Sequence, residues 1–116
     1  MSSATDDLVF KALADASRRR LLDLMRATPS TTSELADQFA TSRFAVMKHL
    51  QVLVDAGLVL VERRGRERIN TLNPVPIQQI HCRWLRQFEA AGADRLLDLA
   101  SHVERPSTKQ RKVARA

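Results

Sequence analysis

The stretch from Thr31 to Gly57, TTSELADQFATSRFAVMKHLQVLVDAG, most strongly constrains what this 116-residue chain can fold into. Thr31 and Glu34 have the spacing of a capping box, in which each side chain satisfies a free backbone N–H, and they predict a helix over about residues 33–39. Ser42 is positioned to be the N-cap of a second helix. Gly57 can adopt the left-handed conformation that ends that helix. The stretch therefore predicts two short helices joined by a tight turn over residues 40–42.

The second of these helices has two chemically different faces. One face is apolar at helical spacing and consists of Val46, Leu50, Leu53 and Val54. The opposite face has members three and four residues apart and consists of Arg43, Phe44, Met47, Lys48 and Gln51. A short helix that is braced by another, and that presents a rigid row of Arg, Lys and Gln, suits the major groove of DNA.

A β-hairpin is expected directly after the second helix. Residues 58–61, LVLV, have the composition of a strand, residues 63–66, RRGR, form a basic turn, and residues 68–72, RINTL, form the returning strand. A hairpin in this position is the wing of a winged helix. The combination is typical of proteins that bind nucleic acids.

With these motifs in this order, the chain resembles the ArsR/SmtB family of bacterial winged-helix repressors. The resemblance covers roughly residues 7–103 and is carried by residues 10–15, FKALAD, residues 34–36, ELA, residues 42–50, SRFAVMKHL, and residues 56–59, AGLV. It implies a mainly α fold with a small β-hairpin, a winged helix-turn-helix, and a long C-terminal helix used for dimerisation. It also implies a function in transcription.

We predict that helix 43–56 and the wing, residues 58–72, contact double-stranded DNA. The predicted DNA-binding residues are Ser42, Arg43, Phe44, Met47, Lys48 and Gln51 on the helix, and Arg63, Arg64 and Arg66 on the wing. Arg can hold guanine through two hydrogen bonds, whereas Lys is a point charge for phosphate or guanine. Phe44 has an alternative, which is to pack back onto the first helix of the motif. His49 lies between the two faces and is expected to be a packing residue.

Two further helices are predicted before the motif. Asp7–Leu13 should form the first, and Asp15 should cap the second over residues 16–27. Residues 1–6 are expected to be a disordered N-terminus. The cluster at residues 18–20, RRR, has two readings: it meets DNA phosphates, or it is surface charge that pairs with Asp15 or Asp23.

A long helix over about residues 75–103 is predicted after the wing, because Pro74 and Pro76 stop the second strand and Pro is tolerated near a helix start. Its apolar stripe extends past what a small core can cover, so we interpret it as a homodimer interface. The predicted interface residues are Ile77, Ile80, Trp84, Phe88, Leu96 and Leu99. Gly92 in mid-helix costs about 1 kcal/mol relative to Ala and marks a site for a kink.

The net charge of +6 is concentrated at one end of the chain. Residues 105–116, RPSTKQRKVARA, contain five basic residues and no acidic one. Their polar composition predicts that residues 104–116 form a flexible basic tail. The remainder is nearly neutral, with local basic clusters on the helix and hairpin that are expected to touch DNA. The length suits a single DNA-binding and dimerisation domain over residues 7–103.

Several other classes of protein are disfavoured. The chain has no apolar run of roughly 18 residues, as a membrane span requires, and its polar, acidic start does not resemble a signal peptide. A lone cysteine, Cys82, excludes an internal disulfide and suits a reducing compartment; we expect its thiol to be buried. We therefore expect a cytoplasmic protein without a membrane partner.

Neither a metal site nor an enzyme active site stands out. Many ArsR/SmtB proteins sense metals through a cysteine pair near the first helix of the motif or through Asp and His on the last helix. Residues 33–40 contain no cysteine. Asp98 and His102 are only weak candidates, because a tight site needs three or four ligands. We expect no cofactor and no catalytic residues, and the sequence does not specify a small-molecule or metal effector.

Together these features favour a sequence-specific DNA-binding transcriptional regulator. We expect a dimeric repressor that reads an inverted-repeat operator with its helix and wing. The alternative is a winged-helix dimerisation or interaction module that does not itself read DNA. Basic residues on both the helix and the wing favour the first reading.

Overall fold

The computed structural model describes residues 3–90 and 92–103. These residues form two compact units, one ending at Ile80 and one beginning at His81, and each is described by itself. Residues 1–2 of the expected N-terminal segment and the predicted tail, residues 104–116, lie outside the described residues.

Two helices begin the first unit: α1, Ser3–Leu13, and α2, Ala16–Ala27. Helix α1 starts earlier than the predicted Asp7, so residues 3–6, which were expected to lie in a disordered segment, belong to its first turn. Asp15 is the N-cap of α2, as predicted, and its carboxylate accepts a hydrogen bond of 3.1 Å from the backbone N–H of Arg18. This cap ends one helix and starts the next even though Ala16 favours helix continuation.

The two helices of the predicted motif are present as α3, Thr32–Ala36, and α4, Arg43–Asp55. The capping box is complete: the N–H of Glu34 donates to Thr31 Oγ1 at 3.0 Å, and the N–H of Thr31 donates to Glu34 Oε1 at 2.8 Å. Helix α3 is shorter than predicted, because residues 38 and 39 donate to carbonyls three residues back, as in a turn.

Local capping chemistry also sets both ends of α4. The hydroxyl of Ser42 accepts a 3.1 Å hydrogen bond from the N–H of Ala45, and Gly57 follows the helix with φ of +78°. The turn before α4 is unstrained, since no non-glycine residue in the described ranges has positive φ. Two helices joined by a tight turn are therefore confirmed.

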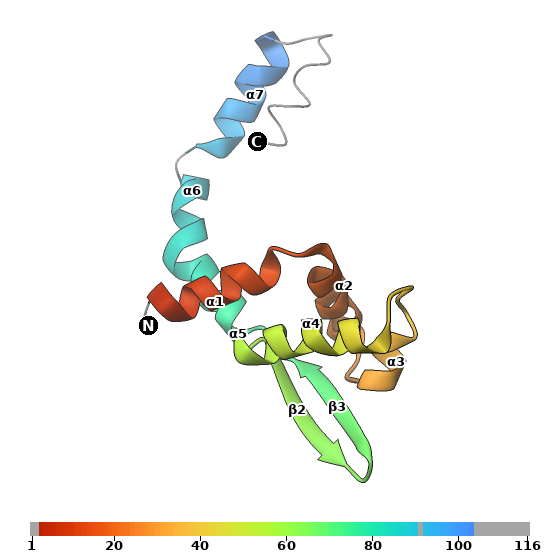
Figure 1. The fold of residues 1–116 in the computed structure, drawn as a ribbon. Coiled ribbons are helices and arrows are strands. Elements are labelled where there is room, and N and C mark those ends of the chain that lie inside the picture. Colours follow the sequence, from red (N-terminus) through yellow and green to blue (C-terminus); the bar gives the residue numbers. More distant parts are fainter. Residues whose placement is uncertain (1–2, 91, 104–116) are drawn as a thin grey trace. The chain divides into compact units, whose positions relative to one another are not determined.

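The wing is part of a three-stranded antiparallel sheet with strand order β1-β3-β2. Strands β2, Val59–Arg64, and β3, Glu67–Leu72, form the hairpin, which extends away from the helices in Figure 1. They are joined by a two-residue turn in which Gly65 has φ of +63°, as at the first central position of a type II′ turn. The third strand, β1, Ser30–Thr31, was not predicted; it pairs with β3 directly before α3.

The four N-terminal helices, the base of the sheet and the short helix α5, Val75–Ile80, share one hydrophobic core. Its fully or nearly buried residues include Val9, Ala12, Leu21, Leu22, Met25, Leu35, Val46, Leu50, Leu53, Leu58 and Val59. Ile80 also belongs to this core with 4% exposure, and Ile77 packs partly against it. Ile80, which was predicted for the dimer interface, therefore helps to close the first unit, as do the other residues in the first turns of the apolar stripe.

The second unit is helical but is not the single long helix that was predicted. After α5 the chain continues as a π-helical turn, His81–Leu85, then α6, Arg86–Ala90, and then α7, Ala93–Val103. Gly92 has φ of +91°, a left-handed conformation that an α-helix cannot contain, so the expected kink is a complete break. Cys82, which was expected to be buried, is exposed.

The second unit exposes a large amount of apolar surface. Trp84 and Phe88 are half exposed and pack edge to face, with ring centroids 5.0 Å apart. Three leucines of α7, Leu96, Leu97 and Leu99, are each more than half exposed. Large apolar side chains that are exposed along a few helical turns are typical of interaction surfaces.

Candidate nucleic-acid interface

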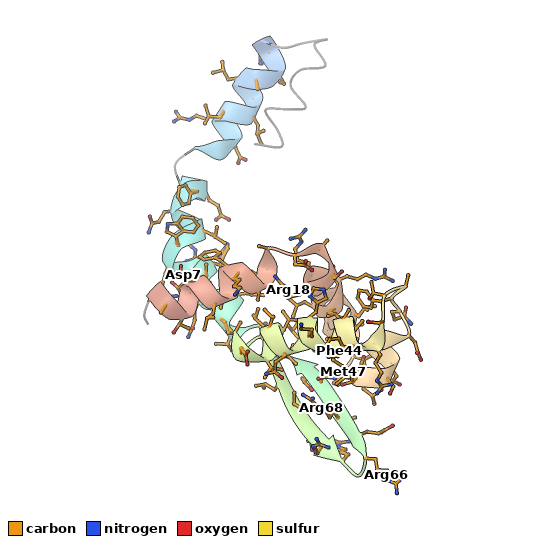
Figure 2. The ribbon with its side chains drawn as sticks, in the orientation of Figure 1. Asp7, Arg18, Phe44, Met47, Arg66 and Arg68 are labelled. Atoms are coloured by element: carbon orange, nitrogen blue, oxygen red, sulfur yellow. The ribbon has the colours of Figure 1, made fainter. Side chains whose placement is uncertain are left out.

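Helix α4 divides into the two faces that its sequence predicted. Val46, Leu50 and Leu53 are buried in the core and hold the helix in place. The exposed side chains of Arg43, Phe44, Met47, Lys48 and Gln51 form what we call the α4 outer face. Figure 2 shows Phe44 and Met47 on the side of α4 next to the wing. A helix anchored along one side presents these groups with little freedom to rearrange.

Phe44 does not pack back onto α3, which was the alternative expected for it. Its side chain is 68% exposed, and the Nζ of Lys48 lies 5.2 Å from the centre of its ring. Lys48 is one helical turn further along, so the cation rests over the ring on the surface. The pair presents an apolar ring and a positive charge side by side, which suits a surface of thymine methyl groups and phosphates.

Two other predicted contact residues already have local partners. The Nε2 of Gln51 donates to Asp55 Oδ1 at 2.8 Å along the same helix. Ser42 uses its hydroxyl to accept the capping hydrogen bond. Arg43, by contrast, is the first residue of α4 and is exposed. Among the polar residues of the α4 outer face, Arg43 and Lys48 are therefore the best placed to bind a ligand.

The predicted arginines of the wing do not share one environment. Arg64 lies 3.4 Å from the carboxylate of Glu62 on the same strand. Arg66 occupies the hairpin turn and is exposed at its tip in Figure 2. Arg68, which the sequence reasoning placed only in the returning strand, borders the same hollow as Arg43 and Arg63. Strand alternation would have identified it once the turn was known to be only two residues long.

The arginines at the start of α2 contact other residues of the protein. They match neither expectation fully, whether contact with DNA phosphates or surface charge that pairs with Asp15 or Asp23. Arg18 donates from Nε to the carbonyl of Ala12 at 2.8 Å and from Nη2 to that of Lys11 at 2.9 Å, which caps the end of α1. Its Nη1 lies 3.2 Å from Nδ1 of His49 on α4. His49 therefore connects α4 to this cap, with Asp15 Oδ2 at 3.9 Å.

The other two arginines of this cluster also have partners in the protein. Arg19 donates to the carbonyl of Leu13 at 2.7 Å. The guanidinium of Arg20 lies 5.1 Å from the centre of the Phe39 ring, within the range of a cation–π contact. We therefore leave residues 18–20 out of the proposed interface.

The ionisation of Asp15 makes the stability of the fold depend on pH. Its hydrogen bond from the backbone N–H of Arg18 lowers the pKa of the carboxyl, and the nearby charges of His49 and Arg18 act in the same direction. A carboxyl whose pKa is lower in the folded protein stabilises the fold above its unfolded pKa, and that contribution is lost as the pH falls through the folded value. The stabilising contribution of Asp15 is therefore lost in a pH range below its ordinary pKa of 3.8.

We predict that Asp15→Asn, which keeps the N-cap oxygen but cannot ionise, lowers stability at pH 5 and above. The urea midpoint of the variant should approach that of the wild type as both are titrated from pH 5 to pH 2.5. Circular dichroism at each pH measures this difference. A midpoint difference that stays constant over the whole range would show that the charge of Asp15 is not involved.

The weak metal candidates gain no support from the structure. Nδ1 of His102 lies 3.1 Å from the backbone carbonyl of Asp98, the other candidate. Within residues 3–90 and 92–103, no group of three or more His, Cys, Asp or Glu side chains is arranged to hold a metal ion.

In the same ranges no helix combines the length and hydrophobicity needed to cross a bilayer.

The helix-turn-helix, the wing and the exposed basic face of α4 define a winged helix-turn-helix protein. Comparison with known proteins agrees. The model of a family described as a helix-turn-helix domain matches residues 13–62, from the end of α1 into β2. The chain is 38% identical over 86 residues to the HTH-type transcriptional regulator YuzN of Bacillus subtilis, which covers 68% of this chain and 94% of YuzN.

A second relative and a solved structure place the chain more narrowly. The transcriptional repressor SdpR of Bacillus subtilis is 31% identical over 84 residues, covering 72% of this chain and 92% of SdpR. The crystal structure of the ArsR family transcriptional regulator RHA00566 aligns with a TM-score of 0.69 and 30% identity, over 77% of this chain and 98% of the other. The chain belongs to the ArsR family of winged helix-turn-helix transcriptional regulators, and it is not an enzyme.

Proposed function

We propose that this protein is a sequence-specific, dimeric transcriptional repressor that reads an inverted-repeat operator with α4 and the wing. The observation that carries the proposal is the α4 outer face, where Arg43, Phe44, Met47 and Lys48 are exposed while the opposite side of the helix is buried. Exposed arginine and lysine on an anchored helix, next to a basic hairpin, match the requirements of major-groove recognition. SdpR, a relative that is 31% identical to this chain, is itself named a repressor.

The proposed dimer is supported by the exposed apolar side chains of the second unit. Trp84, Phe88, Leu96 and Leu99 are between 49% and 65% exposed. A two-fold seam formed by these residues would pair two copies of α4, and a symmetric protein reads a symmetric site. The expected operator is therefore an imperfect inverted repeat with half-sites about one helical turn apart. Repression would follow from steric cover of a promoter.

Electrophoretic mobility shift with duplexes of two kinds tests the proposal. One duplex carries the region upstream of the gene that encodes this chain, and the other has the same length and base composition in shuffled order. The protein should bind the first at least about a thousandfold more tightly at physiological salt, as specific sites generally do. Equal affinity for both duplexes, or no binding to either, would leave the winged helix as an interaction module.

The basic segment at residues 105–116 extends the proposal to non-specific affinity. It carries five of the six net positive charges, and we propose that it acts as an electrostatic arm on DNA phosphates. Deleting residues 105–116 should leave folding and base preference intact while weakening binding. If two charges per subunit engage, a dimer loses about four phosphate contacts, and the slope of log affinity against log salt becomes shallower by about 3.6. Fluorescence anisotropy at several salt concentrations measures the slope, and equal slopes would show that the segment does not touch DNA.

A further inference from the structure

A small hollow lies between the start of α4 and the inner side of the wing. Its volume is about 160 Å³, and the residues that line it include Ser33, Arg43, Arg63, Arg66, Glu67 and Arg68. Four guanidinium groups, one from α4 and three from the wing, therefore border one hollow, with a single carboxylate among these six residues. Figure 2 shows Arg68 on β3, between Met47 on α4 and Arg66 at the hairpin tip. The volume is well below the roughly 300 Å³ or more of small-molecule sites, so the hollow suits a small anionic group.

The strand register separates the arginines of the wing into two sets. Arg63 is directly opposite Arg68, and their face of the hairpin continues to Val61 opposite Asn70 and Val59 opposite Leu72. Val59 and Asn70 are buried, so this face is turned toward the body of the first unit. Arg64 and Glu67 opposite it alternate to the other face, because successive side chains of a strand point to opposite sides. Glu67 nevertheless borders the hollow, because it directly follows the turn.

The two faces of the wing also differ in how their charges are balanced. On the outer face, Arg64 has the carboxylate of Glu62 at 3.4 Å. On the inner face, Arg63 and Arg68 are like charges in directly opposed positions, an arrangement that destabilises a hairpin. Within the described residues, neither has a carboxylate within 4.0 Å. Two unneutralised arginines facing each other across a hairpin are favourable once an anion lies between them.

We propose that this hollow is a clamp for one phosphodiester of the DNA backbone, with Arg63 and Arg68 as its ligands and with Arg64 outside it. The inference rests on the proposed function and makes it more specific. A duplex whose major groove receives the α4 outer face has a backbone strand between that helix and the wing. The planar guanidinium groups suit a phosphate because each can donate two parallel hydrogen bonds to its oxygens.

The chain contains its own matched control for this clamp. Arg68→Gln and Arg63→Gln each remove one positive charge from the inner face, and Arg64→Gln removes one from the outer face of the same hairpin. Binding to a shuffled-sequence duplex is measured by fluorescence anisotropy between 50 and 300 mM KCl, concentrations chosen to span about a sixfold range of salt. Because each clamp neutralises one phosphate, the double variant Arg63→Gln/Arg68→Gln should reduce the salt slope by about 0.9 per subunit, or about 1.8 for a dimer. Each single inner-face variant should give part of this reduction, whereas Arg64→Gln should leave the slope unchanged.

Equal slope changes for Arg64→Gln and Arg68→Gln would overturn the clamp, since the effect would then be one of net charge. Unchanged slopes for both inner-face variants would also overturn it. Thermal unfolding of each variant checks the fold, and removal of one of two opposed like charges should not lower stability. The shuffled duplex keeps this test apart from the proposed function, which depends on preference for the upstream region. Loss of that preference with normal slopes would count against the proposed function alone.

A second measurement separates the DNA backbone from free phosphate. Single methylphosphonate linkages, which are uncharged, are placed one at a time along the upstream duplex. One position should weaken wild-type binding and leave the affinity of the double variant Arg63→Gln/Arg68→Gln unchanged, because that variant has lost both contacts to the phosphate. Additive losses at every position would contradict the clamp. Inorganic phosphate at constant ionic strength should compete no better than chloride, and selective competition by phosphate would instead indicate a site for the free anion.

Discussion

Trp84→Asp is expected to yield monomers that bind the operator at least a thousandfold more weakly than the wild type. Trp84 is 49% exposed in the second unit and packs edge to face with Phe88. A Trp side chain buries about 150–250 Å² when covered, so covering the exposed half contributes about 2–3 kcal/mol per subunit. A carboxylate in the same seam loses that contribution in both subunits and adds a desolvation cost. The total exceeds the about 4 kcal/mol that a thousandfold change in affinity requires.

Sedimentation velocity and anisotropy measure the two parts of this prediction. Trp84→Phe is the matched control, because it keeps an aromatic ring in the seam and should remain a dimer with affinity close to that of the wild type. Circular dichroism of Trp84→Asp should show a folded protein, since the buried residues of the core all lie at or before Ile80. A Trp84→Asp protein that sediments as a stable dimer would place the seam elsewhere.

Arg43→Ala is the second large expected effect, and it concerns base preference. Arg43 is the first residue of α4, is exposed, and borders the hollow next to the wing. Its loss should cost about 1–3 kcal/mol for each half-site and relax preference at one base pair of that half-site. Anisotropy on a panel of single-base operator variants tests this directly. The wild type should discriminate at that position, and Arg43→Ala should not.

Arg26→Ala is the matched control for charge. Arg26 is also an exposed arginine, but it lies at the end of α2, where Asp23 is 3.9 Å away. The substitution should leave base preference unchanged and lower affinity only slightly, in a salt-dependent way. If Arg43→Ala instead weakened binding to every operator variant equally, Arg43 would be a phosphate ligand and would belong to the clamp.

The features that the sequence predicted well are those that depend on residues close together in the chain. The Thr31–Glu34 box, the Asp15 and Ser42 caps and the left-handed Gly57 each depend on partners within four positions. Such local chemistry is visible without knowing the fold. It located the helix-turn-helix and the two faces of α4, and with them most of the candidate site.

The features that were missed depend on contacts between distant residues. The pairing of β1 with β3 joins positions about forty residues apart, and no pattern in the two residues of β1 indicates it. Arg18 as a cap on α1 and Ile80 in the core likewise follow from tertiary packing. The two environments of the wing arginines required the hairpin register, which became fixed only with the two-residue turn at Gly65.

The buried Asn70 on β3 has a consequence for how DNA binding can be controlled. Its Nδ2 donates to the carbonyl of Ser30 at 3.2 Å and to the hydroxyl of Thr32 at 3.1 Å, which fastens the wing to the start of α3. These hydrogen bonds hold the wing in a fixed position relative to the helix-turn-helix. A signal that released such a protein from DNA by moving the wing away from the helix-turn-helix would have to break buried hydrogen bonds, which costs free energy. In the dimer that we propose, the separation between the two helix-turn-helix units can change without breaking these bonds, so we expect binding to be controlled by the residues that join the subunits.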